Sequence, residues 1–168
     1  FTPEEKEDIY RKIGLGALKY YILKVDPRKN MTFNPEESID FNGNTGPFIQ
    51  YTYARIQSVL RKAMESGIEM SERINSQVMP NSKEIDLIKI LQDFPDVVKE
   101  AATEYNPGLI ANFCYELARE YNQFYHDFSV LHNKDTRTRD FRIILSITTG
   151  FVIESAMNLL GIEMPERM

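Results

Sequence analysis

The sequence has few of the residues that disulfides and metal sites require. It contains one cysteine, Cys114, and two histidines, His126 and His132, among 168 residues. One cysteine cannot form an internal disulfide, and neither histidine has a cysteine or carboxylate at the spacing of a metal-ligand motif. We therefore expect no metal site, which argues against a small metal-dependent enzyme, and we expect a buried thiol in a reducing, cytoplasmic environment.

Long apolar runs and phosphate-binding loops are also missing. No segment approaches the roughly 18 apolar residues of a membrane span, and the first residues lack the basic and apolar regions of a signal peptide. No glycine-rich loop follows a predicted strand, so we expect no nucleotide site within this chain. Because the sequence begins with Phe1, directly before a predicted helix, we expect it to be part of a longer protein.

The chain has no surplus of basic residues. Lys and Arg number 20 and Asp and Glu number 25, which gives a net charge of −5. A domain that grips duplex nucleic acid mainly by neutralising phosphates is usually strongly basic, so that binding mode is not expected. Base stacking and local basic patches are still compatible with this charge. The hydrophobic content of 42% is that of a folded globular domain.

The first residues carry the pattern of a helix start. The segment Thr2-Pro3-Glu4-Glu5 combines a capping box with proline at the first helical position. The apolar spacing continues this helix to about Leu23. Gly14 and Gly16 inside it predict either a close approach of another helix or an interruption. The expected apolar face consists of Ile9, Ile13, Ala17 and Tyr20 or Tyr21.

Residues 25–47 differ in character from the segments on either side. They are rich in proline, asparagine and glycine and have no helical period, so we expect a long structured loop with at most a short strand at Ser38 to Phe41. Irregular segments of this length are uncommon in compact domains and are often functional. We therefore divide the chain into residues 1–45, a helix plus structured loop, and residues 46–168, a helical domain.

Helical periodicity dominates the second part. Ser82 is expected to cap a short helix, and Pro95 either ends it or begins another that runs to about Glu104. Gly161 suits the position that closes the last helix. The fold predicted is all-α, an antiparallel bundle of about five to seven helices. The other helices are expected at about 46–66, 109–131 and 138–160, with Tyr53, Cys114, Tyr121 and Phe124 in the core.

One polar stripe on helix 46–66 combines an aromatic ring with cations. An exposed ring can stack on an unpaired base for about 1–3 kcal/mol, while neighbouring cations bind phosphates. The alternative is an ordinary solvated face, or a tyrosine that packs on another helix. The stripe lies opposite the apolar face, with spacings of four, three and four residues, and consists of Tyr51, Arg55, Ser58 and Lys62.

A second stripe with the same spacing flanks the core side of helix 109–131. It consists of Tyr115, Arg119, Asn122 and His126. Asn122 carries both a donor and an acceptor and could read a base edge. Such a stripe is also typical of the margin of a helix-packing interface, so both interpretations stay open.

Several segments, in order along nearly the whole chain, resemble arginyl-tRNA synthetases. The most specific is Phe41-Asn42-Gly43-Asn44-Thr45-Gly46-Pro47-Phe48-Ile49-Gln50-Tyr51. Others are Gly14-Leu15-Gly16-Ala17-Leu18-Lys19-Tyr20-Tyr21, Tyr115-Glu116-Leu117-Ala118 with Asn122-Gln123-Phe124-Tyr125, and Leu160-Gly161-Ile162-Glu163-Met164-Pro165-Glu166-Arg167-Met168.

The resemblance implies a class I synthetase that ligates arginine to tRNA(Arg) with ATP and magnesium. The catalytic domain of that enzyme would precede this chain, in which neither an H-I-G-H-like nor a K-M-S-K-S-like string occurs. This chain would be the helical domain that receives the anticodon stem and loop, with no catalytic residue, metal or cofactor of its own. The parent enzyme is expected to be a monomer.

The resemblance also implies which residues bind tRNA. By position, these are Asn42, Asn44, Gln50, Tyr51, Arg55, Asn122, Tyr125, Arg167 and Met168. The stripes add Lys62, Tyr115 and Arg119, and we expect Arg55, Lys62 and Arg119 to bind phosphates. The competing interpretation is a helical protein–protein interaction module, in which the same stripes contact a partner helix and no RNA binds.

Overall fold

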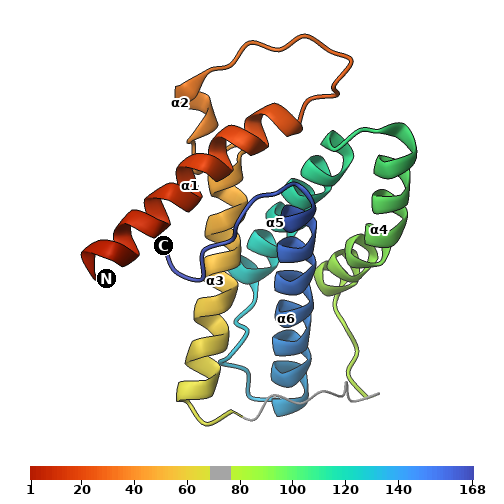
Figure 1. Cartoon of the computed structure of the whole chain (residues 1–168). Helices are drawn as coiled ribbons and strands as arrows, with labels where there is room; N and C mark the ends of the chain where they lie inside the picture. Colours follow the sequence, from red (N-terminus) through yellow and green to blue (C-terminus); the bar gives the residue numbers. More distant parts are fainter. Residues whose placement is uncertain (69–76) are drawn as a thin grey trace.

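The fold of the chain, seen in a computed structural model that describes residues 1–68 and 77–168, is entirely helical. These residues form six α-helices and no strand, which confirms the predicted all-α fold of about five to seven helices (Figure 1). No helix in the described ranges is long and apolar enough to cross a membrane. The helices are α1 (Pro3–Leu23), α2 (Pro35–Ser38), α3 (Gly46–Glu65), α4 (Ser82–Glu104), α5 (Gly108–Asp127) and α6 (Thr136–Leu159).

Helix α6 packs antiparallel to both α3 and α5 in the centre of the bundle (Figure 1). The Tyr121 hydroxyl on α5 donates to Ser146 Oγ on α6 at 3.0 Å. On the other side of α6, a Cβ at Gly150 would lie 3.1 Å from Ile56 on α3, so glycine permits this close approach. Helices α4 and α5 form an antiparallel hairpin in which the rings of Phe94 and Phe113 stack at 5.4 Å.

Helices α3 and α5 lie side by side and run in the same direction. Near their first residues, the rings of Phe48 and Tyr115 pack at 5.4 Å. Further along both helices, Asn122 Nδ2 donates to Thr52 Oγ1 at 2.8 Å. The contact line between α3 and α5, here called the seam, therefore aligns two segments that are far apart in sequence.

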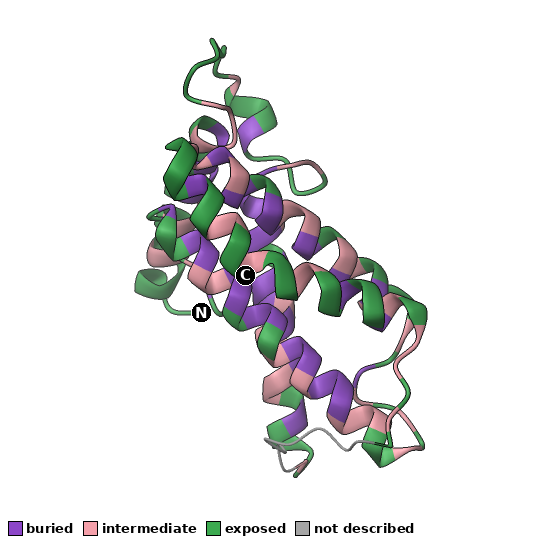
Figure 2. Ribbon diagram, turned by 90° about the vertical axis from the view of Figure 1, so that its right-hand side faces the viewer, coloured by how far each residue is buried: buried purple, intermediate pink, exposed green. Residues whose placement is uncertain are grey.

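Buried residues lie where the helices face one another, and exposed residues lie on the outside of the bundle (Figure 2). Tyr53, Cys114, Tyr121 and Phe124 all belong to this core, as predicted. Burial raises the pKa of the Cys114 thiol, because the thiolate would lose its solvation. The expected buried, free cysteine is thus confirmed.

Helix α1 forms as predicted and continues through both of its glycines. Its capping box is complete, since Thr2 N–H donates to Glu5 Oε2 at 2.7 Å and Glu5 N–H to Thr2 Oγ1 at 3.2 Å. The expected close approach occurs at Gly16, where a Cβ would come within 2.5 Å of the Gln50 side chain. A Cβ at Gly46 on α3 would likewise come within 2.6 Å of the Gly16 carbonyl oxygen. The two glycines let α1 and α3 cross in backbone contact.

The prediction of a short strand at Ser38 to Phe41 was wrong. The structure instead has the short helix α2, whose N-cap Asn34 accepts hydrogen bonds from the N–H groups of Glu36 and Glu37. Proline after an N-cap asparagine, followed by two acidic residues, favours a helical turn. The rest of 25–47 is irregular, as expected. The division at residue 45 stays a prediction.

Helix α4 corrects two predictions. It is continuous from Ser82 to Glu104 with Pro95 inside it, and Asn81 rather than Ser82 is its N-cap. Proline removes one backbone hydrogen bond, but buried Leu87 and Ala101 hold the helix on either side of it. Packing therefore outweighs the local helix-breaking tendency.

Helix α5 ends at Asp127, earlier than the predicted end near residue 131. The backbone becomes extended at Phe128, and Val130 is buried in the loop that follows. Gly161 has a positive φ of 67° after α6, so the predicted helix end there is confirmed.

Candidate nucleic-acid interface

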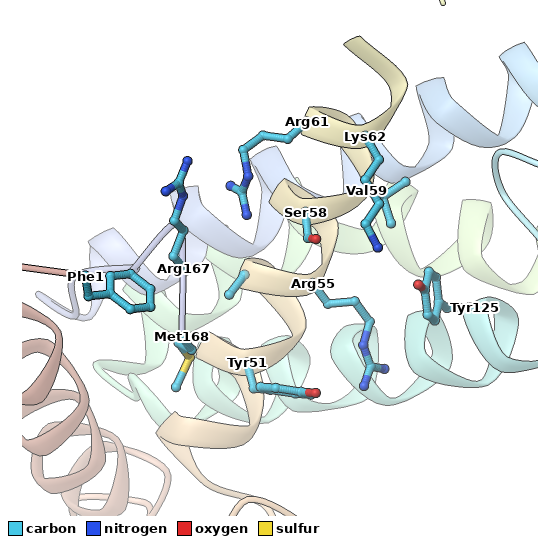
Figure 3. Close-up of a pocket in the computed structure, with 11 residues that line it drawn as sticks. Phe1, Tyr51, Arg55, Ser58, Val59, Arg61, Lys62, Tyr125, Arg167 and Met168 are labelled. Carbon is cyan, nitrogen blue, oxygen red and sulfur yellow. The ribbon is translucent and has the colours of Figure 1, made fainter. Parts of the chain in front are cut away.

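The seam carries an arginine held between two tyrosines. The Arg55 guanidinium carbon lies 5.0 Å from the centre of the Tyr51 ring and 5.2 Å from that of Tyr125, both within cation–π range. Arg55 also donates to Asn122 Oδ1. Figure 3 shows the guanidinium between the two rings. Four predicted site residues from two distant segments therefore meet at one place.

Asn122 holds Arg55 in this arrangement through hydrogen bonds within the protein. Its Oδ1 accepts from Arg55, and its Nδ2 donates to Thr52, whose hydroxyl in turn donates to the Phe48 carbonyl at 2.9 Å. Both ends of the Asn122 amide are thus bonded within the protein. The residue orients Arg55, and a direct contact of Asn122 with a base stays a prediction.

A cavity of about 390 Å³ opens beside Arg55 and is here called the tyrosine cavity. It holds four cationic side chains and no acidic one, although the whole chain has a net charge of −5. Lys62 and Arg167 make no hydrogen bond or ion pair with any residue in the described ranges, so both charges are available to a ligand. The lining residues are Phe1, Tyr51, Ala54, Arg55, Ser58, Val59, Arg61, Lys62, Tyr125, Arg167 and Met168.

The last residues of the chain, 161–168, are here called the tail, and the final two, Arg167 and Met168, line this cavity. Several hydrogen bonds hold the tail against α1 and α3. Lys19 Nζ donates to the Gly161 carbonyl, and Arg11 forms a two-pronged pair with the Glu163 carboxylate at 2.8 and 2.9 Å. Arg61 donates to the Glu166 carbonyl at 3.1 Å. The hydrogen bond from Arg11 lowers the pKa of Glu163, so the carboxylate stays ionised.

Gln50 corrects the sequence prediction. Its side chain is 0% exposed, so it cannot touch RNA. Nε2 donates to the carbonyl of Lys12 on α1 at 3.0 Å and to that of Glu163 in the tail at 2.9 Å, while Oε1 has no partner among the described residues. Gln50 therefore fixes the position of the tail relative to α1 and α3.

The two asparagines of the preceding loop lie outside the tyrosine cavity. Asn44 joins the loop to α1 and α5. Its Oδ1 accepts a hydrogen bond from the Tyr20 hydroxyl at 2.6 Å, and its Nδ2 donates to Asn112 Oδ1 at 3.2 Å. Asn42 is exposed and free to meet a ligand through its side chain. The loop reaches the site through Phe41, whose ring meets Tyr51 edge-on at 6.4 Å.

Most of the second stripe does not join the tyrosine cavity. The Tyr115 ring packs on Phe48, and Arg119 forms ion pairs with Glu116 and Glu120. A phosphate would have to compete with both carboxylates for Arg119. Sequence reasoning missed Arg61, because its place in the site depends on the tail that follows α6.

Comparisons with known proteins point to one family. Residues 49–168 match the family model of the DALR anticodon binding domain. The chain is 62% identical to an arginine–tRNA ligase of Phocaeicola vulgatus and 61% identical to one of Bacteroides thetaiotaomicron, each over 99% of this chain. It spans 28% of the length of these relatives.

Solved structures give the same result. The Thermus thermophilus arginyl-tRNA synthetase matches with a TM-score of 0.87 and 34% identity, over 97% of this chain and 28% of that one. The Plasmodium falciparum arginyl-tRNA synthetase shares the fold, with a TM-score of 0.83 and 24% identity, over 96% of this chain and 28% of that one. The resemblance seen in the sequence is thus confirmed, and the chain belongs to the DALR anticodon binding domain family.

Proposed function

We propose that this chain binds the anticodon stem and loop of tRNA(Arg) as part of a longer arginine–tRNA ligase. The observation that carries the proposal is the cavity in which Arg55 lies between Tyr51 and Tyr125, with three further cations and no acidic side chain. The family match and the names of the relatives support the same partner.

Tyr51 is the residue on which an unpaired base would stack. Its side chain is 45% exposed, and Arg55 holds the ring in place. Tyr125 plays another part, because its ring already contacts the Arg55 guanidinium and stacks with the ring of Tyr121, whose centre is 6.3 Å away. The Tyr125 hydroxyl has no partner among the residues that the structure describes, so it would bond to a base edge.

The cations of the cavity would bind the phosphates of the loop. Lys62 and Arg167 need not break an existing bond to do so, whereas Arg61 and Arg55 already hold protein groups. For single-stranded RNA each phosphate contact contributes about −0.7 to the slope of log K against log salt. Two free cations therefore predict a slope of about −1.4, and all four about −2.8.

The remaining parts of the proposal concern the longer protein. It would ligate arginine to tRNA(Arg) in the cytoplasm, as a monomer, with its catalytic domain preceding this chain. ATP and magnesium would be bound by that domain. The residues described here include no group of three or more His, Cys, Asp and Glu placed to hold a metal ion.

The test is a titration of the chain with the anticodon stem and loop of tRNA(Arg), and with that of a noncognate tRNA, at several salt concentrations. We expect Tyr51→Ala to weaken binding of the cognate RNA by about fivefold to 150-fold, the equivalent of 1–3 kcal/mol of stacking. Tyr10→Ala is the matched control, because Tyr10 is 70% exposed on α1 and lines no cavity described here.

Two outcomes would contradict the proposal. Undetectable binding, or equal binding of both RNAs with no effect of Tyr51→Ala, would favour a protein–protein interaction module. A large loss of thermal stability in Tyr51→Ala would show that the ring is a packing residue instead.

A further inference from the structure

A second cavity adjoins the tyrosine cavity where α3 and α5 approach their last residues. It has a volume of about 330 Å³ and shares Val59, Lys62 and Tyr125 with the first. We propose that this cavity, here called the histidine cavity, binds the next nucleotide of the same RNA strand, with Lys62 on the phosphate between the two nucleotides. Its other lining residues are His126, Phe128, Ser129, Val130, Leu131 and His132.

The charges that line the tyrosine and histidine cavities favour them over the other surface cavities as a path for RNA. Of four surface cavities in the described part of the chain, the one between α1 and the tail is lined by Glu5, Asp8 and Glu166. Another, beside Arg119, contains Asp127. The tyrosine and histidine cavities alone among these four contain cations and no carboxylate side chain. A polyanion is therefore repelled least along the path that joins them.

Lys62 stands at the boundary between the two cavities. It is exposed, and it makes no hydrogen bond or ion pair with the residues described. Its ammonium group can therefore bind a phosphate without first losing a protein partner. A cation shared by two adjoining cavities matches a sugar–phosphate chain, which carries one negative charge between successive bases.

The two cavities share walls, so they suit adjacent nucleotides. Val59 on α3 and Tyr125 on α5 line both cavities, one from each side of the seam. A strand that leaves the tyrosine cavity past Tyr125 therefore enters the histidine cavity directly.

The groups that line the histidine cavity can hold a base. Phe128 is fixed, because the Arg142 guanidinium lies 5.0 Å from its ring centre and the Phe124 ring packs at 6.1 Å. His132 is exposed, and its backbone N–H donates to Ser129 Oγ at 3.1 Å, which shapes the loop around the cavity. The imidazole of His132 then offers a donor and an acceptor to a base edge.

This inference rests on the proposed function, and the experiment separates the two. The probes are the anticodon stem and loop of tRNA(Arg) and a set of versions in which one loop base at a time is removed to leave an abasic sugar. The variants are His132→Glu, which places a carboxylate in the histidine cavity, and Tyr51→Ala. Thr148→Glu is the matched control, since it makes the same charge change at an exposed site on α6 that lines neither cavity.

We expect His132→Glu to weaken binding of the intact loop by about tenfold or more, within the range for loss of one base contact, and Thr148→Glu to have little effect. Removal of one particular base should eliminate the effect of His132→Glu, and removal of the adjacent base should eliminate that of Tyr51→Ala. Lys62→Ala should reduce the magnitude of the salt slope by about 0.7.

If His132→Glu and Thr148→Glu bind the intact loop equally while Tyr51→Ala weakens it, the second subsite is wrong and the proposed function stands. The proposal of a second subsite is also wrong if removal of the same base eliminates the effects of both His132→Glu and Tyr51→Ala. It is equally wrong if the two bases identified in this way are not adjacent. If the unaltered chain does not bind the loop, the proposed function itself has failed.

Discussion

The buried amide of Gln50 gives a sharp test of how the tail is held. Gln50→Glu replaces the Nε2 donor, which reaches the carbonyls of Lys12 and Glu163, with a group that can only accept when it is ionised. A protonated carboxyl can still donate one hydrogen bond. Burial at 0% exposure, together with two facing carbonyl oxygens, raises the pKa of the introduced carboxyl above its unfolded value of about 4.3.

The sign of the pH dependence follows from this shift. Below about pH 4 the introduced carboxyl is protonated in both states, and the variant should lose about 1 kcal/mol for one missing hydrogen bond. As the pH rises towards the folded pKa, the free energy of unfolding should fall by a further amount of about 1.4 kcal/mol per pH unit. The variant should therefore become progressively less stable than the unaltered chain from about pH 4 up to the raised pKa of the folded state, above which the difference should level off.

Thermal or urea unfolding from pH 4 to pH 8 measures the effect. Gln92→Glu is the matched control, because it makes the same change at an exposed position of α4 and should show no such trend. A stability difference between Gln50→Glu and the unaltered chain that stays constant with pH would refute the reasoning, since the introduced carboxyl would then be hydrated rather than buried.

Three more predictions concern other contacts. Glu84→Gln should destabilise the fold by about 3 kcal/mol in urea unfolding, because it leaves buried Arg142, now 2.7 Å from the Glu84 carboxylate, without a counter-charge; a loss below about 0.5 kcal/mol would contradict this. Cys114 is 0% exposed and its pKa is raised by this burial, so a thiol reagent should modify the chain only through opening of the fold, and rapid native labelling would be contrary evidence. If Arg11 acts on RNA only through the tail, Arg11→Met combined with Arg167→Ala should weaken RNA binding less than the product of the single effects, whereas strict additivity would show that they act separately.

Local patterns in the sequence were sufficient for much of the fold. The capping box fixed the start of α1, and apolar periodicity located α3 and α6 within two residues at each end. Pro95 led to a wrong prediction for α4, because the contacts of Leu87 and Ala101 that hold its two halves come from the rest of the bundle. The end of α5 was also missed, since burial of Val130 is a tertiary effect.

The site residues also fall into those that local sequence patterns predict and those that depend on tertiary packing. Tyr51, Arg55 and Lys62 lie on one face of one helix, so the spacing alone predicted that their side chains would share a direction. Tyr125 joins them only because α3 and α5 lie side by side. Gln50 was misassigned because its burial depends on the close crossing of α1 and on the tail, neither of which its own helix reveals.

The side-by-side arrangement of α3 and α5 makes recognition a property of the folded domain. Arg55 and Asn122 are separated by 67 positions in the chain, so neither a peptide of α3 nor one of α5 reproduces their contact. A ligand that requires this contact binds the native state and not the unfolded chain. At a hundred times its Kd such a ligand would raise the free energy of unfolding by about 2.7 kcal/mol, and weakening the seam would lower affinity and stability together.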